Sequence, residues 1–311
     1  MTESQYIDLR QLTKTLINFS KSQGEDLRPE DIDTYINQAV MLSKLECDDA
    51  TKTRLFIDIE YEYKIVHNKG QAIFNNYDEK REWYSNMEIQ DNFFWSRYKD
   101  YLINHSSISR ICINLLDDVT LPDIMNCLGN PNDTLDKPRL RRGLIIGDVQ
   151  SGKTATYTGL ICKAADAGYK VVILLTGITE NLRRQTQERI DEGIVGITLK
   201  KEGKIEKYTR VGVGLDNKQI KATSVTSTFN DFVGNCNKIT MSLANNSLVL
   251  FVIKKNVSVL QRLYNWLREQ NIDPVKGYVD VPMLLIDDEA DNASVNTRKD
   301  ETDPTRTNKF I

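Results

Sequence analysis

The sequence has only two histidines, no closely spaced pair of cysteines and no long apolar run. Neither His67 nor His105 is spaced from a second histidine or a cysteine in the way that zinc ligands are, which argues against a zinc site. The five cysteines are scattered, odd in number and never arranged as C-x-x-C, a usage typical of reduced thiols. We therefore expect a cytoplasmic protein whose thiols mainly fill space in the core.

The chain also shows no pattern of a membrane span or a signal peptide. Its longest apolar run, at residues 248–253, has the length of a strand and is far shorter than the roughly 18 residues of a membrane span. The first residues, MTESQYIDLRQ, lack a positive segment followed by an apolar one. Because the net charge is −3, no global basic field exists, and any contact with nucleic acid must depend on local patches.

Two regions of different character follow one another along the chain. Residues 1–138 carry apolar residues at helical spacing, as in QYIDLRQLTKTLINFSK, and close with a glycine- and proline-containing stretch that we interpret as a linker. In their aromatic stripe, NFFWSRYKDYLI, we expect core packing rather than base stacking. From residue 139 to 311, short apolar strands alternate with helical patterns. This alternation predicts an α/β fold with a parallel sheet and helices on both faces.

The expected elements of the second region are few and short. Strands are predicted at 144–146, 171–175, 248–253 and 283–286, and helices at 153–167, 179–192 and 257–270. The segment 193–245 carries no clear pattern, and we interpret its charged run, KKEGKIEK, as a solvated turn. The polar stretch 68–81 is expected to be a loop.

The stretch GDVQSGKT matches the P-loop pattern G-x-x-x-x-G-K-[ST] completely. In that pattern the backbone N–H groups surround the phosphates, the lysine reaches the β- and γ-oxygens, and the threonine hydroxyl coordinates Mg²⁺. A short apolar run precedes the stretch and a helical pattern follows it, which is the setting that a P-loop requires. The predicted nucleotide-binding residues are Gly147, Asp148, Val149, Gln150, Ser151, Gly152, Lys153 and Thr154.

An acidic cluster follows the last predicted strand in VPMLLIDDEADNAS. Hydrolysis of a nucleotide needs a carboxylate in the Mg²⁺ shell and a group that positions the attacking water. We assign Asp288 to the metal shell beside Thr154 and Glu289 to orienting or deprotonating the water. Asp287 is the weaker candidate because neighbouring strand positions point to opposite faces. The alternative interpretation is an acidic turn whose side chains cap a helix.

Several of these motifs together resemble a known family. The tetrad DEAD at 288–291 resembles motif II of superfamily II helicases, and LLTGITENLRRQTQERI resembles their motif Ia, with Thr176, Leu182 and Gln185 at the matching positions. In combination with GDVQSGKT and FVIKKN, they resemble the Z-one domain family of helicase-like P-loop proteins from bacteria and their mobile elements. The resemblance covers roughly residues 95–311.

The resemblance implies a RecA-like, magnesium-dependent ATPase lobe encoded in phage-defence or restriction-like gene clusters. Its partners would be nucleic acid, expected to be DNA, and a nuclease or second ATPase from the same cluster. It implies that Arg183, Arg184 and Gln185 face nucleic acid, although such residues also fit a solvated helix face. Lys254 and Lys255 match a lysine pair of the family, whose role the resemblance leaves open.

The sequence departs from the family after motif II. The next motif and a second RecA-like lobe with its arginine finger are missing, and such a finger contributes about 10³–10⁵ in rate. We therefore expect a first lobe that binds nucleotide weakly and hydrolyses it slowly or not at all. The leading hypothesis is a helicase-like motor lobe that acts on nucleic acid. The alternative is an ATP-gated switch or scaffold that recruits a nuclease or partner ATPase without translocation.

Overall fold

The computed structural model describes most of the chain: residues 2–23, 27, 29–63, 82–89, 91–106, 108, 110–133, 140–146, 152–203, 205–234, 247–270, 272–291, 294, 305 and 307–308. The chain forms two compact units, one of Met1–Asp78 with Leu102–Thr120 and one of Glu79–Tyr101 with Leu121–Ile311. Residues 79–101 and 121–138, which the sequence analysis groups with the N-terminal region, thus associate with the second unit. Among the described helices, none has the length and apolar character needed to cross a membrane.

The first unit is helical, as its apolar spacing predicts. It contains α1 (Glu3–Ser22), α2 (Pro29–Ser43), α3 (Asp49–Tyr63), α5 (Arg110–Leu115) and a π-helical turn, η1 (Leu116–Thr120). Helix α1 begins with a capping box, in which the Thr2 hydroxyl accepts from the Gln5 N–H and the Gln5 side chain accepts from the Thr2 N–H. The inward faces of α1, α2 and α3 form one apolar core: Tyr6, Leu9, Ile17, Ile32, Ile36, Ala39, Leu55, Phe56 and Ile59.

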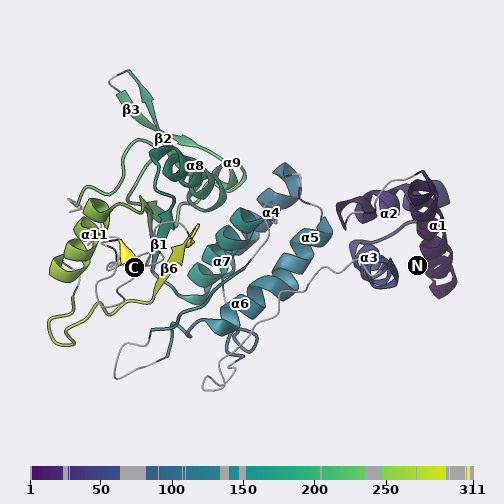
Figure 1. Ribbon diagram of the computed structural model, residues 1–311, viewed down its shortest axis with the longest axis horizontal. Coiled ribbons are helices and arrows are strands. Elements are labelled where there is room, and N and C mark those ends of the chain that lie inside the picture. Colours follow the sequence, from purple (N-terminus) through teal and green to yellow (C-terminus); the bar gives the residue numbers. More distant parts are fainter. Residues whose placement is uncertain are drawn as a thin grey trace. The chain divides into compact units, whose positions relative to one another are not determined.

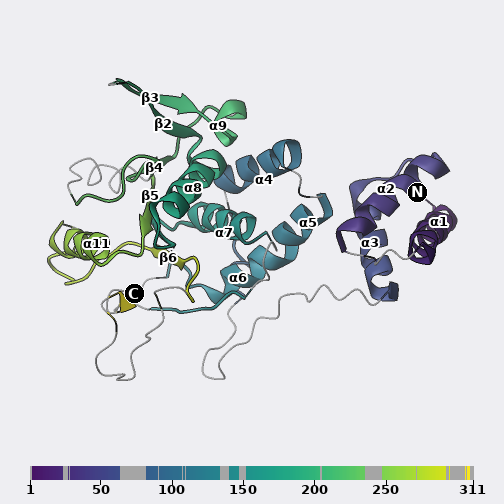
Figure 2. The same ribbon diagram turned by 45° about the horizontal axis from the view of Figure 1, so that its top comes forward.

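The second unit is built on a parallel sheet of four strands. The strands are β1 (Val171–Thr176), β4 (Ala222–Ser224), β5 (Leu248–Lys254) and β6 (Met283–Asp287), in the order β4-β5-β1-β6. All their pairings are parallel. The helices are α4 (Phe93–His105, of which residues 93–101 belong to this unit), α6 (Leu121–Cys127), α7 (Lys153–Ala167), α8 (Glu180–Ile190) with its π-helical extension η2 (Asp191–Val195), α9 (Val213–Asp216) and α11 (Val257–Gln270). Figures 1 and 2 show α11 on one side of the sheet and α7 and α8 on the other.

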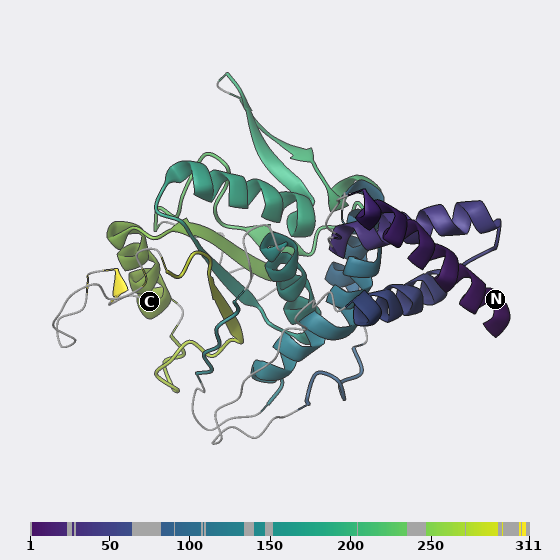
Figure 3. The ribbon, with the colours of Figure 1, turned by 45° about the vertical axis from the view of Figure 1, so that its right-hand side comes forward.

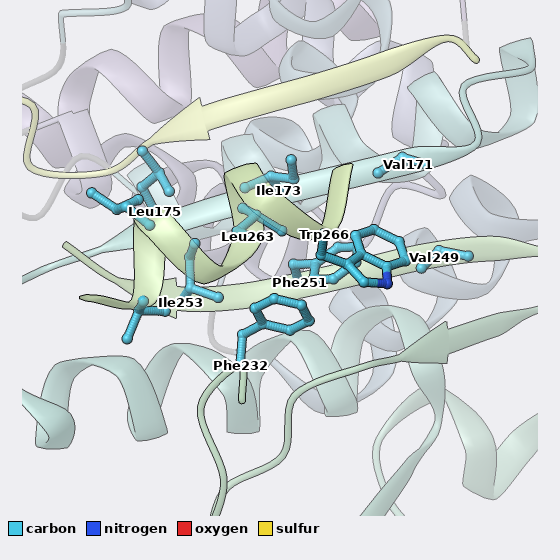
Figure 4. Packing of buried hydrophobic residues seen from close by; sticks show 11 residues of the cluster. Val171, Ile173, Leu175, Phe232, Val249, Phe251, Ile253, Leu263 and Trp266 are labelled. Carbon is cyan, nitrogen blue, oxygen red and sulfur yellow. The ribbon is translucent and has the colours of Figure 1, made fainter. Parts of the chain in front are cut away.

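Both faces of the central strands β1 and β5 are buried, which explains why these strands read as continuous apolar runs. One face packs against α11, with an aromatic group formed by Phe232, Phe251 and Trp266 at its centre (Figure 4). The alternate residues of β1 and β5 point to the opposite face and are equally buried. Helix α8 contacts both of these strands, and α7 contacts β6. The predicted parallel sheet with helices on both faces is confirmed.

The strand predicted at 144–146 is wrong in this structure. Residues 140–146 form neither helix nor strand, and Leu144 and Ile146 are 78% and 88% exposed. An apolar run of three residues indicates a tendency to be buried but does not supply the neighbouring backbone that a strand needs. The sequence also gave no sign of β4 or of the antiparallel hairpin of β2 (Ile197–Glu202) and β3 (Ile205–Arg210). The run KKEGKIEK spans the hairpin's turn, and the stretch 68–81 lies outside the described residues.

The aromatic stripe of α4 belongs to the core, as predicted. Phe93, Phe94 and Tyr98 are buried. The N-terminal N–H groups of Phe94 and Trp95 donate to the Asp166 carboxylate of α7 at 2.9 and 2.8 Å. Because a carboxylate at a helix N-terminus satisfies unpaired donors and complements the helix dipole, this contact fixes α4 to α7.

A buried polar network ties α8 to the sheet. Gln187 donates to Asp191 Oδ1 at 2.8 Å and to Ser224 Oγ at 2.9 Å. Thr226 Oγ1 donates to the side-chain oxygen Oε1 of Gln187 at 2.7 Å and accepts from the Val252 N–H at 2.9 Å. Burial raises the pKa of Asp191 to about 6, although hydrogen bonds from Thr198 and Gln187 oppose the increase. The network therefore contains a carboxyl group that is easier to keep protonated than one in water.

The pH dependence of stability tests this network. A carboxyl whose pKa is raised on folding stabilises the protein below its ordinary pKa of 3.8 and loses that contribution as the pH rises through about 6. In the wild type, Asp191 should lower the free energy of unfolding by up to about 3 kcal/mol between pH 4 and 7, at about 1.4 kcal/mol per pKa unit. Replacing Asp191 with Asn should remove this part of the decrease. Urea unfolding across this range measures it. Asp100→Asn, an exposed position on α4, should leave the wild-type profile, and an unchanged profile in Asp191→Asn would contradict the assignment.

Candidate functional site

The carboxyl ends of three parallel strands meet at one edge of the sheet. Thr176 of β1 pairs with Lys254 of β5, and Leu175 pairs with Asp287 of β6. The turns that follow these strands therefore start side by side. This edge is where ligands bind in open parallel sheets.

The first turn of α7 starts at the end of the GDVQSGKT stretch. Gly152 precedes the helix with φ of +75°, a backbone conformation that favours glycine, and offers no side chain to cap the helix. Lys153 is exposed, and Thr154 Oγ1 accepts a hydrogen bond from Arg189 of α8 at 3.0 Å. The predicted phosphate-binding residues before them, Gly147, Asp148, Val149, Gln150 and Ser151, lie outside the described residues.

Burial raises the pKa of the Tyr157 phenol, and the Asp288 carboxylate adds to this increase, whereas the Thr154 and Arg189 side chains oppose it. These groups come from three elements: Thr154 lies in the first turn of α7, Arg189 in the last turn of α8, and Asp288 directly after β6. Helix α7 contacts β6. The elements that carry the two predicted metal-binding residues are therefore neighbours.

Glu289 is directed toward the end of β1. A Cβ atom added at Gly177 would lie 2.5 Å from Leu182 Cδ1 and 3.0 Å from Glu289 Oε2, so a side chain at this position would displace the ends of both. Glu289 itself has φ of +55°, which is uncommon for a residue with a side chain. Its N–H donates to Asp288 Oδ1 at 3.1 Å. Asp288 continues the sheet by donating its N–H to the Leu175 carbonyl oxygen at 2.9 Å.

Of the three residues expected to face nucleic acid, Arg183 does not fit that role. Its side chain is 0% exposed and pairs with Glu180 of its own helix. It also donates to the carbonyl oxygens of Ser227 at 2.9 Å and Thr228 at 3.4 Å. A guanidinium enclosed in this way holds the 227–228 turn against α8 and has no surface to offer a ligand. Arg184 and Gln185, the next two residues of the helix, are exposed.

Sequence reasoning missed Arg189 and left the roles of Lys254 and Lys255 open. Arg189 lies four residues after Gln185 and therefore on the same helical face. That spacing is the signal that could have linked it to the site. Lys254 forms an ion pair with Glu180 at 3.0 Å, and Lys255 forms one with Asp287 at 2.8 Å.

The donor set fits a divalent cation that is shared with a polyanion. No group of three His, Cys, Asp or Glu side chains that could enclose a metal occurs among the described residues. Magnesium rarely needs such a cage, because it keeps several waters and takes one or two protein ligands plus phosphate oxygens. The Thr154 hydroxyl and the Asp288 carboxylate supply that number. The exposed Lys153 adds the positive charge that a polyphosphate requires.

Comparison with known proteins adds no relative. The scan against protein-family models, the search of the curated proteins and the search of the solved structures each returned no match.

Substitutions of the adjacent Arg183 and Arg184 on α8 test whether the two side chains have different roles. Arg183→Ala removes a buried cation together with its hydrogen bonds to the Ser227 and Thr228 carbonyl oxygens, so the free energy of unfolding should fall by about 2–4 kcal/mol. Arg184→Ala removes only an exposed side chain and should change it by less than about 0.5 kcal/mol. Chemical denaturation measures both values. If Arg183→Ala were as stable as Arg184→Ala, a structural role for Arg183 would be excluded.

Proposed function

We propose that the second unit is a RecA-like P-loop lobe that binds and hydrolyses a nucleoside triphosphate with Mg²⁺. The observation that carries the proposal is that α7, whose first turn holds Lys153 and Thr154, contacts β6, which leads directly into Asp288 and Glu289. The resemblance to the Z-one domain family favours ATP as the nucleotide. It also favours a helicase-like role in phage defence or a restriction-like system.

The start of α7 would hold the phosphates. The N-terminus of a helix of 15 residues carries a partial positive charge and unpaired N–H groups, which favour an anion. Gly152 lets the backbone turn closely around that anion, and the Lys153 ammonium neutralises the terminal phosphates. The Thr154 hydroxyl would bind Mg²⁺ after the Arg189 guanidinium has left it, because the guanidinium and Mg²⁺ repel each other at one oxygen.

The end of β6 would supply the hydrolytic groups. Asp288 would bind the water shell of Mg²⁺, and Glu289 would orient or deprotonate the attacking water. The Mg²⁺ ion, when bound, neutralises charge on the phosphate oxygens. The exposed Glu289 carboxylate beside Gly177 faces the same sheet edge as the start of α7.

Two exposed groups favour nucleic acid, expected to be DNA, as the partner. Arg184 and Gln185 remain accessible on α8. The β2–β3 hairpin projects from the second unit (Figure 3), with the exposed Lys200 and Lys207 directly opposite one another. Like charges in such a cross-strand pair are unfavourable by themselves, and a phosphate backbone would relieve the repulsion.

Two substitutions test the nucleotide site. Lys153→Ala should abolish binding of a fluorescent ATP analogue at concentrations that saturate the wild type, because it removes the charge that offsets the phosphates. Glu289→Gln should retain this binding and stop phosphate release, measured under single-turnover conditions so that slow hydrolysis is detected. Lys218→Ala, an exposed lysine between α9 and β4, is the control and should match wild type. Undiminished hydrolysis in Glu289→Gln would show that another group positions the water.

The competition at Thr154 gives a separate test. Arg189→Ala removes an exposed hydrogen bond that Mg²⁺ must displace, and such a bond contributes about 0.5–1.5 kcal/mol. The Mg²⁺ concentration for half-maximal nucleotide binding should therefore fall about two- to tenfold, whereas Arg184→Ala on the same helix should leave it unchanged. A higher Mg²⁺ requirement in Arg189→Ala would mean that Arg189 instead supports the bound nucleotide.

A further inference from the structure

The two lysines that end β5 point in opposite directions and have different surroundings. Lys254 is partly exposed and pairs with Glu180 at the start of α8. Lys255 follows it directly, and its side chain is fully buried on the side of β6. A buried ammonium is costly unless it is paired and hydrogen-bonded. The buried Lys255 ammonium therefore needs partners that compensate its charge.

Two contacts of the Lys255 ammonium go to the segment that carries the acidic cluster. It lies 2.8 Å from Asp287 Oδ1, and it donates to the Glu289 carbonyl oxygen at 2.6 Å. The ammonium thus joins the last residue of β6 to a residue two positions later. Asp287, the weaker candidate for metal binding, is occupied by this ion pair.

The same contacts hold the Glu289 backbone in its uncommon conformation. Its φ of +55° is a conformation that non-glycine residues adopt only where their surroundings impose it. The Glu289 N–H donates to Asp288 Oδ1, and its carbonyl oxygen accepts from Lys255. Both the N–H and the carbonyl oxygen of Glu289 are therefore hydrogen-bonded, and the donor to the carbonyl oxygen is Lys255, the residue that follows β5.

We propose that Lys255 is a positioning residue that holds the Asp288–Glu289 turn so that the Glu289 carboxylate lies beside Gly177 at the sheet edge. The inference rests on the proposed function, in which Glu289 positions the attacking water. Lys255 itself is buried and does not contact the nucleotide. Its neighbour Lys254 fastens α8 to β5 instead and provides a matched control.

Hydrogen exchange on the full chain tests the positioning without any requirement for turnover. In Lys255→Met the amides of residues 287–291 should exchange at least about tenfold faster, while those of β1 remain protected. Lys254→Met should leave both segments unchanged. Because Lys255→Met leaves the Asp287 charge unpaired, the double variant with Asp287→Asn is measured as well. Wild-type exchange of the turn in either variant would overturn the proposal, as would loss of the fold in both.

Single-turnover hydrolysis tests the link to Glu289. In Lys255→Met the rate should fall at least about tenfold, with the nucleotide Kd within about threefold of wild type. Adding Glu289→Gln should slow it no further than Glu289→Gln alone, because residues that act as a unit are not additive. An additional loss in the double variant would refute an action through Glu289. If the wild type hydrolyses nothing, the proposed function fails, and the exchange experiment still decides the role of Lys255.

Discussion

The parallel pairing of β1 with β5 and β6 is the constraint on which the candidate site depends. It aligns Thr176 with Lys254 and Leu175 with Asp287, so three turns begin at one edge of the sheet. Both faces of β1 and β5 are buried, and a slip in their register would expose apolar side chains and separate the turns. The hydrophobic effect that stabilises the sheet thereby also determines which polar residues can meet.

Much of this fold could be predicted from the sequence because the signals were local and of the right length. The helix 153–167 was predicted with its correct bounds from its apolar face and from Gly168, which ends it with φ of +116°. The six- and seven-residue strands β1 and β5 were recognisable as continuous apolar runs. The three-residue run at 144–146 had equal apolar character but does not form a strand, because pairing depends on a neighbour that no local pattern encodes.

The residue types of the site could be predicted from the sequence, but the directions in which their side chains point were harder to predict. Arg183 and Arg184 are adjacent and chemically identical, yet one is enclosed by the 227–228 turn and the other is exposed. Which arginine is enclosed depends on a turn more than 40 residues away in the sequence. Lys255 shows the same limit, because its partners Asp287 and Glu289 come from a different strand. Periodicity identifies the face of a helix but not what covers it.

The lysines near this edge differ in exposure, and they therefore differ in the groups that their ammonium can contact. Lys255 is enclosed and neutralised by Asp287, and Lys254 is paired with Glu180, so both charges serve contacts within the protein. Lys153 is exposed at the start of α7, where a helix N-terminus adds to its positive field. A polyphosphate requires a cation that it can approach and that no nearby carboxylate already neutralises. Among these three lysines, exposure together with position singles out Lys153, the lysine that the P-loop pattern independently identifies.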